Sequence, residues 1–505
     1  MDPFTRIPAE LRLQIFSSLQ SKATISSLIQ ASPIMLKQYL GYKSTVTRNL
    51  LERDFDDQMI QDAMGIILFP SLREARKSTF LVHEHLKSWE SREFPNPLTT
   101  RDAFLVDQLD KLHSLLMVFV EDYITKATAA FPPREYICLP QLSHNQRYLV
   151  FKGQKVTKRS DSCHLTDAER RRFLRAFLHV ELLSLIHKAL SFTTGDRMLV
   201  AKLSRRFRRR HMEAFHCIWV YASSLYGAIF AHCSDAWLPA VDAPPETRLL
   251  FPDNFFADPV EYGKDVGIRS KEDLLAVENM ACYGFSLIFT MICFAITRPQ
   301  DTKALESYAK KLCSFKMDPT LHIGCRFKRR FSREREYGPL YRHSSSYRQH
   351  LAGRIWWKSI GSPLPLYFGV VIKIFQQRAW PFFDDDHHYP EDTDVLPVFP
   401  NVYALHYMEL EREDEVSSLS GSGPVTRGRV ERTMSEFRRS QKWQDKMKQR
   451  QGNNSSTESS LPRISIGNRG VALPPIEDQD QLLTWSFRGV VQWDASLEAY
   501  VLVKK

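Results

Sequence analysis

The side chains best suited to metal chemistry stand in DDDHHYPED, residues 384–392, which brings carboxylates and imidazoles together. Such groups are common ligands of divalent cations. No second cluster at ligand spacing accompanies the stretch, the motif H-E-x-x-H does not occur, and Pro381 and Pro390 stand beside or within it. We therefore expect a solvated loop there and predict no metal site.

Catalytic signatures are missing from the sequence as well. Serines, histidines and acidic residues are abundant, but the phosphate-binding motif G-x-x-x-x-G-K-[ST], the dinucleotide motif G-x-G-x-x-G and the nucleophile motif G-x-S-x-G do not occur. The sequence therefore predicts a non-catalytic protein with no catalytic residues and no cofactor.

The cysteines suggest the cellular compartment. None of the eight stands in a C-x-x-C pair, so reduced and mostly buried thiols are expected. The opening MDPFTRIPAE has neither a basic region nor an apolar region of a secretion signal. We expect a cytoplasmic or nuclear protein, or one found in both. The cysteines are Cys138, Cys163, Cys217, Cys233, Cys282, Cys293, Cys313 and Cys325.

Positive charge is concentrated in three segments. Residues 202–210, 326–335 and 427–450 carry net charges of +6, +5 and +6, so the rest of this +11 chain is mildly acidic. Such runs could bind nucleic acid or an import receptor. Apolar residues keep helical spacing through the first run, so a solvated helix face explains its arginines equally well. The candidate basic patch is Arg205, Arg206, Arg208, Arg209 and Arg210.

Helical periodicity dominates the chain before residue 411, and strand-like alternation is rare there. One apolar stripe consists of Leu105, Leu109, Leu112, Leu116, Phe119 and Tyr123. Further along, Thr166 and Glu169 have the spacing of a capping box, and Phe173, Phe177 and Val180 follow on one side. No internal repeat is evident. We predict a mainly α fold.

An uncharged apolar stretch and a weak hairpin signal add to the predicted fold. The uncharged stretch 281–296 is shorter than the ~20 residues that cross a bilayer. Ser270 and Asp273 have capping spacing upstream of it, so we predict a buried core helix that starts near Ser270, and no membrane contact. Residues 136–151 give a weak signal for a small hairpin.

Composition divides the chain into four segments. Residues 1–45 form a small helical module, and 46–410 form a helical globular body that could bind a partner. The polar and basic residues 411–480 cannot bury enough apolar area to fold, so a disordered linker is expected there. Aromatic and β-branched residues then predict a short C-terminal β-hairpin within 481–505 that packs on the body.

The opening module has its own helical pattern. Pro8 suits the start of a helix, and Leu11, Ile15 and Leu19 then recur every four residues. A second apolar set and the boundary residue Pro33 follow, and a third short helix is expected after it. Three short helices cannot enclose a substantial core. The module therefore needs a partner, which is either the body or another protein.

This arrangement resembles the F-box, the helical module through which substrate receptors attach to the adaptor Skp1. The ending ASP resembles the variant common in filamentous fungi, and the resemblance covers residues 4–43. Two positions depart from the family pattern: Ile7 replaces a leucine, and Ile34 to Leu36 replace a tryptophan. The matching residues are Ile7, Pro8, Glu10, Leu11, Ile15, Phe16, Leu19, Ile25 and Leu28.

The resemblance implies a substrate receptor of a Skp1–cullin ubiquitin ligase, in which the body holds an unknown protein substrate. Charge at Leu11 and Ile15 is then expected to abolish Skp1 binding. Two alternatives stay open: a nucleic-acid-associated protein that uses the basic runs, and an interaction protein outside ligases with a degenerate F-box. The candidate Skp1-binding residues are Ile7, Pro8, Leu11, Ile15, Leu19, Ile25, Leu28 and Pro33.

Overall fold

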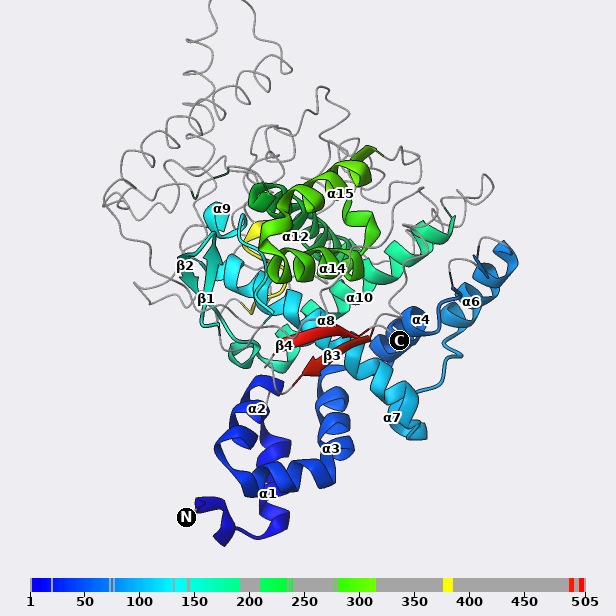
Figure 1. Ribbon diagram of the computed structural model, residues 1–505. Coiled ribbons are helices and arrows are strands. Elements are labelled where there is room, and N and C mark those ends of the chain that lie inside the picture. Colours follow the sequence, from blue (N-terminus) through cyan, green and yellow to red (C-terminus); the bar gives the residue numbers. More distant parts are fainter. Residues whose placement is uncertain are drawn as a thin grey trace, which may run out of the picture.

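The computed structural model is mostly helical in the part of the chain that it describes, as the sequence predicts (Figure 1). The described residues are 2–19, 21–71, 74–75, 78–129, 132–142, 146–190, 209–233, 236, 238, 277, 280–314, 376–384, 490–494 and 499–503. The predicted linker 411–480 lies outside these residues.

The N-terminal end consists of a 3-10 turn and three helices: η1 (Pro3–Arg6), α1 (Ala9–Ser18), α2 (Lys22–Ala31) and α3 (Pro33–Asp54). Local signals define their starts. The Ser21 hydroxyl accepts the Thr24 amide hydrogen, and the Ser32 hydroxyl accepts that of Met35. The third helix is longer than predicted, because it continues to Asp54 past a kink at Tyr42.

The body contains the remaining helices, of which α10 is central: it packs against α4, α8, α12 and η4. Figure 1 shows α8 and α10 passing between the N-terminal helices and α12 to α15. The elements are α4 (Asp57–Ile67), α6 (Thr79–Ser91), α7 (Pro97–Thr100), α8 (Ala103–Thr128), α9 (Pro132–Glu135), η2 (Ser162–His164), α10 (Asp167–Leu190), α12 (Arg209–Cys233), η4 (Ala281–Tyr283), α14 (Phe285–Thr297), η5 (Pro299–Asp301) and α15 (Thr302–Ser314).

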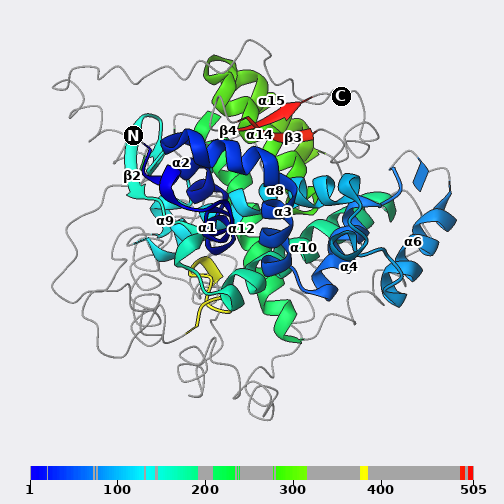
Figure 2. The same ribbon diagram turned by 90° about the horizontal axis from the view of Figure 1, so that it is seen from below.

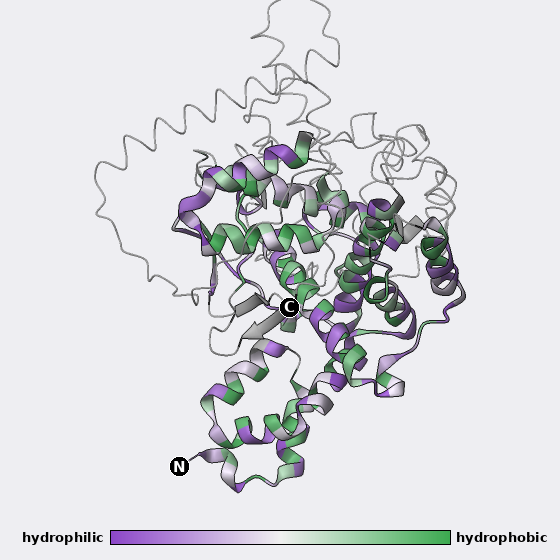
Figure 3. Ribbon diagram, turned by 45° about the vertical axis from the view of Figure 1, so that its right-hand side comes forward, coloured by the Kyte–Doolittle hydropathy of each residue, from purple (hydrophilic) through white to green (hydrophobic). Residues whose placement is uncertain are grey.

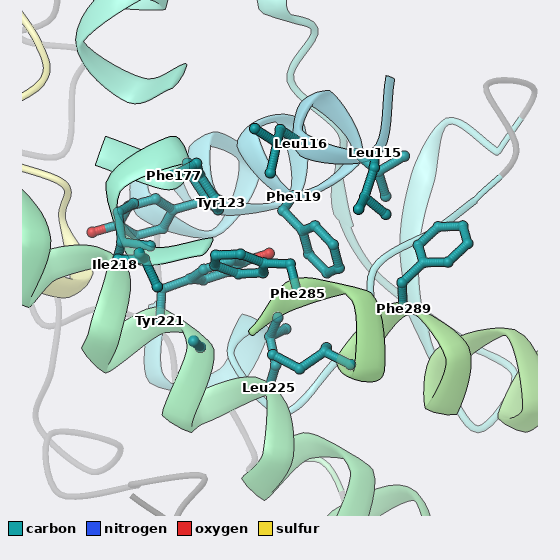
Figure 4. Close-up of a cluster of buried hydrophobic side chains, with 14 of the residues drawn as sticks. Leu115, Leu116, Phe119, Tyr123, Phe177, Ile218, Tyr221, Leu225, Phe285 and Phe289 are labelled. Atoms are coloured by element: carbon teal, nitrogen blue, oxygen red, sulfur yellow. The ribbon is translucent and has the colours of Figure 1, made fainter. Parts of the chain in front are cut away.

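The predicted apolar stripe of α8 forms the middle of the body core, and all six of its residues are buried. Figure 4 shows Phe119 and Tyr123 of α8 facing Phe177 of α10, Tyr221 of α12 and Phe285 of α14. The rings of Phe119 and Phe285 lie 4.9 Å apart, and those of Tyr123 and Tyr221 lie 4.7 Å apart in a stacked arrangement. Aromatic packing therefore joins four helices.

The capping box at the start of α10 is confirmed. The Thr166 amide donates to Glu169 Oε2 at 2.8 Å, and the Glu169 amide donates to the Thr166 hydroxyl at 3.2 Å. Phe173, Phe177 and Val180 are buried on the core side, as predicted.

The predicted buried helix of the 281–296 stretch is present as α14, but it begins at Phe285 and not near Ser270, which lies outside the described residues. Gly284 separates η4 from α14 with φ +78° and ψ 178°, values that few residues except glycine adopt. Among the described helices, α12 contains the one segment long and apolar enough to span a bilayer, and 78% of its apolar window is buried in the body.

The described structure also contains two antiparallel hairpins. Strands β1 (Tyr148–Phe151) and β2 (Gln154–Lys158) pair around Lys152 and Gly153, both at positive φ. The hairpin therefore lies later than the weak signal at 136–151 predicts, since residues 136–142 form no strand. Strands β3 (Val490–Asp494) and β4 (Ala499–Val503) pair in the segment predicted as a C-terminal hairpin, and β3 lies next to α8.

A short segment from the later part of the chain, residues 376–384, is inserted between these helices. The Phe382 ring stacks on Phe173 of α10 at 4.2 Å. The Tyr136 hydroxyl donates to the Gln377 carbonyl at 2.7 Å, and the Arg378 guanidinium donates to the carbonyls of Ala127 and Ala129 at the end of α8. The segment thereby satisfies main-chain groups that would otherwise be buried without partners.

Candidate docking surface

The N-terminal helices enclose a hydrophobic core of their own, separate from the body core. Around it pack partly buried residues that include Leu13, Ile29 and Tyr39. The Tyr39 ring lies 5.8 Å from that of Phe16. We call residues 2–50 the module. Its buried hydrophobic residues are Phe16, Ile25, Met35, Val46 and Leu50.

Helix α3 contributes residues to both cores. Leu50 belongs to the module core, whereas the next residue, Leu51, belongs to the body core. Figure 1 shows the module projecting from one end of the molecule, and Figure 2 views that end directly. Helix α3 is kinked at Tyr42, near the predicted boundary at residue 45, and its second part runs across that boundary to Asp54.

The structure divides the predicted docking residues into two groups. Pro8, Leu11 and Pro33 are exposed, and 48% of the Leu11 surface is accessible. Ile25 is buried in the module core with 4% of its surface accessible, which leaves it out of a partner's reach in this structure. The others are partly buried, and all of these except Ile7 pack on the module core: Ile7, Ile15, Leu19 and Leu28.

Sequence reasoning missed a second set of exposed apolar residues on α3. Leu36 and Leu40 are 40% and 66% accessible, and Tyr42 is 46% accessible. The four-residue spacing of Leu36 and Leu40 places them on one side of the helix with the exposed Pro33. That spacing was visible in the sequence, but the same pattern also describes a helix face turned toward a core. Figure 3 shows hydrophobic residues along the module helices.

Polar contacts fix the module on the body. Lys22 at the start of α2 reaches Asp110 Oδ1 and the Ser114 hydroxyl of α8, each at 2.5 Å. The Thr24 hydroxyl lies 3.6 Å from the Cys163 sulfur. None of these contacts involves α3, on which Leu36, Leu40 and Tyr42 are exposed.

A buried ionic cluster holds α3 in the body just beyond the module. Asp54 accepts hydrogen bonds from Arg170 Nε at 2.7 Å and from His113 Nε2 at 2.9 Å. Burial by itself would raise the pKa of Asp54. The hydrogen bond and charge of His113, with the charges of Arg170 and Arg53, outweigh burial and lower that pKa to about 2. Asp54 therefore stays charged and holds α3 to α8 and α10.

The structure describes the other two candidate sites, the basic patch and the acidic and histidine stretch 384–392, only in part. Arg205, Arg206 and Arg208 of the basic patch lie outside the described residues, whereas Arg209 and Arg210 form the start of α12. Asp384, the first residue of the acidic and histidine stretch, accepts hydrogen bonds from Arg172 at 2.7 Å and from Thr166 at 3.2 Å. No described residues form a group of three His, Cys, Asp or Glu side chains suited to a metal ion.

None of the cysteines within the described ranges forms a disulfide, and Cys325 lies outside these ranges. Burial raises the pKa of Cys138, Cys217 and Cys293 well above that of an ordinary thiol. A thiol reacts as its thiolate, so these three side chains behave as core residues.

Comparison of the chain with protein-family models, with curated proteins and with solved structures found no match.

Proposed function

We propose that this chain is a non-catalytic adaptor whose module binds a Skp1-like protein. Through that protein the chain would join a cullin scaffold, and the body would hold a protein substrate for ubiquitin transfer. The adaptor contributes proximity, because two proteins held in one complex meet at a high effective concentration.

One observation supports this proposal above all: the module has its own small core and still exposes apolar side chains. A helical unit that served only as part of the body would be expected to turn its large apolar residues toward the body core. Instead Leu11, Leu36 and Leu40 are each at least 40% accessible. Leu36 and Leu40 also lie one turn apart on α3, and neighbouring exposed apolar residues are typical of protein interaction sites.

The experiment is a binding titration of purified Skp1 with the full chain and with Leu11→Asp. Leu11 is exposed, so its substitution should leave the fold intact. Ile15 is a poor choice by the same reasoning, because it packs on the module core and its substitution would test folding. Loss of an apolar contact and burial of a new charge should weaken binding at least about 30-fold.

The matched control is Phe80→Asp on α6, which also places a charge at an exposed apolar site of the same chain. It should bind Skp1 as the wild type does. Addition of a cullin then separates a ligase adaptor from an interaction protein outside ligases. Failure of the folded wild type to bind Skp1 would remove the proposal.

A further inference from the structure

Three tyrosine hydroxyls are buried where α12, η4 and α15 come together. Tyr226, Tyr283 and Tyr308 are 0%, 2% and 8% accessible. Helix α12 packs against both η4 and α15. None of the three hydroxyl oxygens has a hydrogen-bond partner among the described residues. Buried hydroxyls in folded proteins are nearly always paired, so three unpaired ones in a single region point to a ligand.

The three groups lie within electrostatic reach of one another. Burial is the largest cause of the raised pKa of each hydroxyl. For Tyr226, the neighbouring Tyr283 and Tyr308 raise the pKa further, and for Tyr283 so does Tyr308. All three hydroxyls are therefore neutral near pH 7 and available as both donors and acceptors.

The charged side chains of Lys188 and Glu181 do not pair with the three hydroxyls, because they make other hydrogen bonds. Lys188 Nζ donates to the Tyr283 main-chain carbonyl at 3.1 Å. Glu181 accepts from the Phe285 amide at 2.6 Å and from the Ser286 hydroxyl at 3.1 Å. A neutral partner therefore suits the three neutral hydroxyls. Buried water typically makes about three hydrogen bonds to otherwise unpaired groups, which matches the number of hydroxyls here.

We propose that Tyr226, Tyr283 and Tyr308 form an internal hydration site, in which ordered water bridges the three hydroxyls and ties α15 to α12 and η4. Without such a partner, each buried hydroxyl would raise the unfolding constant roughly 5- to 150-fold. A phenylalanine at the same position would fill the space without that cost. The site is independent of the docking proposed for the module.

Tyrosine-to-phenylalanine variants of the full chain test the proposal by denaturant unfolding. Each single variant should raise the unfolding constant about 2- to 10-fold, because it removes a satisfied hydrogen bond. The double variant Tyr226→Phe/Tyr308→Phe should have a smaller effect than the product of the two singles, since both hydroxyls bind the same water. Single variants that are neutral or stabilising would overturn the proposal, as would fully additive effects.

Two control variants calibrate this assay. Tyr221→Phe removes a hydroxyl that donates to Asp122 Oδ2 at 2.7 Å, so it must destabilise the protein. Tyr148→Phe changes a ring that is 40% accessible and should have no effect. A high-resolution crystal structure gives the direct readout: a water peak within hydrogen-bonding distance of the three hydroxyls is expected. A protein group in that position would refute the hydration site.

Discussion

Replacement of Gly284 by alanine should be among the most damaging small substitutions in the body. A Cβ atom at this position would lie 2.7 Å from Glu181 Oε2 and 3.1 Å from the Ser184 Cβ. The Glu181 carboxylate cannot retreat freely, because it accepts the hydrogen bonds of the Phe285 amide and the Ser286 hydroxyl at the start of α14. The substitution therefore strains the backbone and disturbs a buried cap together.

The cost has two parts. A residue other than glycine at this φ and ψ costs ~1–3 kcal/mol. Displacement of the buried carboxylate from its donors costs a further ~1–3 kcal/mol. We expect Gly284→Ala to lower the free energy of unfolding by about 4 kcal/mol, a large part of the stability of an ordinary domain.

Equilibrium unfolding in urea, followed by circular dichroism, measures this effect. Gly41→Ala is the matched control, because a Cβ there meets nothing within 4 Å and the residue is exposed on helix α3. That control should be neutral or up to ~1 kcal/mol more stable. A loss below ~1 kcal/mol for Gly284→Ala would show that the backbone and the Glu181 cap adapt, and the reasoning would be wrong.

Three further substitutions test charged groups by unfolding and hydrogen exchange. The pKa of Asp54 is about 2 in the folded protein, against 3.8 for an ordinary aspartate. Its charge should therefore stabilise the folded state by about 2 kcal/mol above pH ~4, and this stabilisation is lost as the pH falls through ~2. Asp54→Asn should abolish the acid-dependent loss. Burial raises the pKa of Glu135 to about 8. The free energy of unfolding should therefore fall as the pH rises from ~4.5 to ~8, because the unfolded chain ionises this carboxyl first. Glu135→Gln should be as stable as the wild type at pH ~4.5 and up to ~5 kcal/mol more stable at pH ~8. Lys22→Ala removes the contacts with Asp110 and Ser114, so exchange should rise in α2 while global stability changes by less than ~1 kcal/mol. Unchanged pH profiles, or unchanged exchange in α2, would contradict these expectations.

The sequence predicted well where the signal is local. The stripe of α8 and the Thr166–Glu169 capping box depend on residues a few positions apart, so periodicity and spacing were sufficient. The mainly helical fold follows from the same regularity. Pro33 at the first position of α3 is a further local signal that held.

The rest depends on contacts between distant residues, which spacing does not encode. The break at Gly284 accompanies a cap supplied by Glu181, about a hundred residues earlier. The charge of Asp54 is compensated by His113 and Arg170 from two other helices. In the module, Ile25 and Leu11 carry the same apolar signal, yet one is buried and the other is exposed. Only the arrangement of the three helices separates them.

Calorimetric titration of Skp1 into the full chain tests the central claim most directly, with Leu11→Asp and Phe80→Asp measured beside the wild type. The account predicts saturable binding by the wild type and by Phe80→Asp, and at least about 30-fold weaker binding by Leu11→Asp. Absence of binding by the folded wild type, or equal binding by all three proteins, would contradict it.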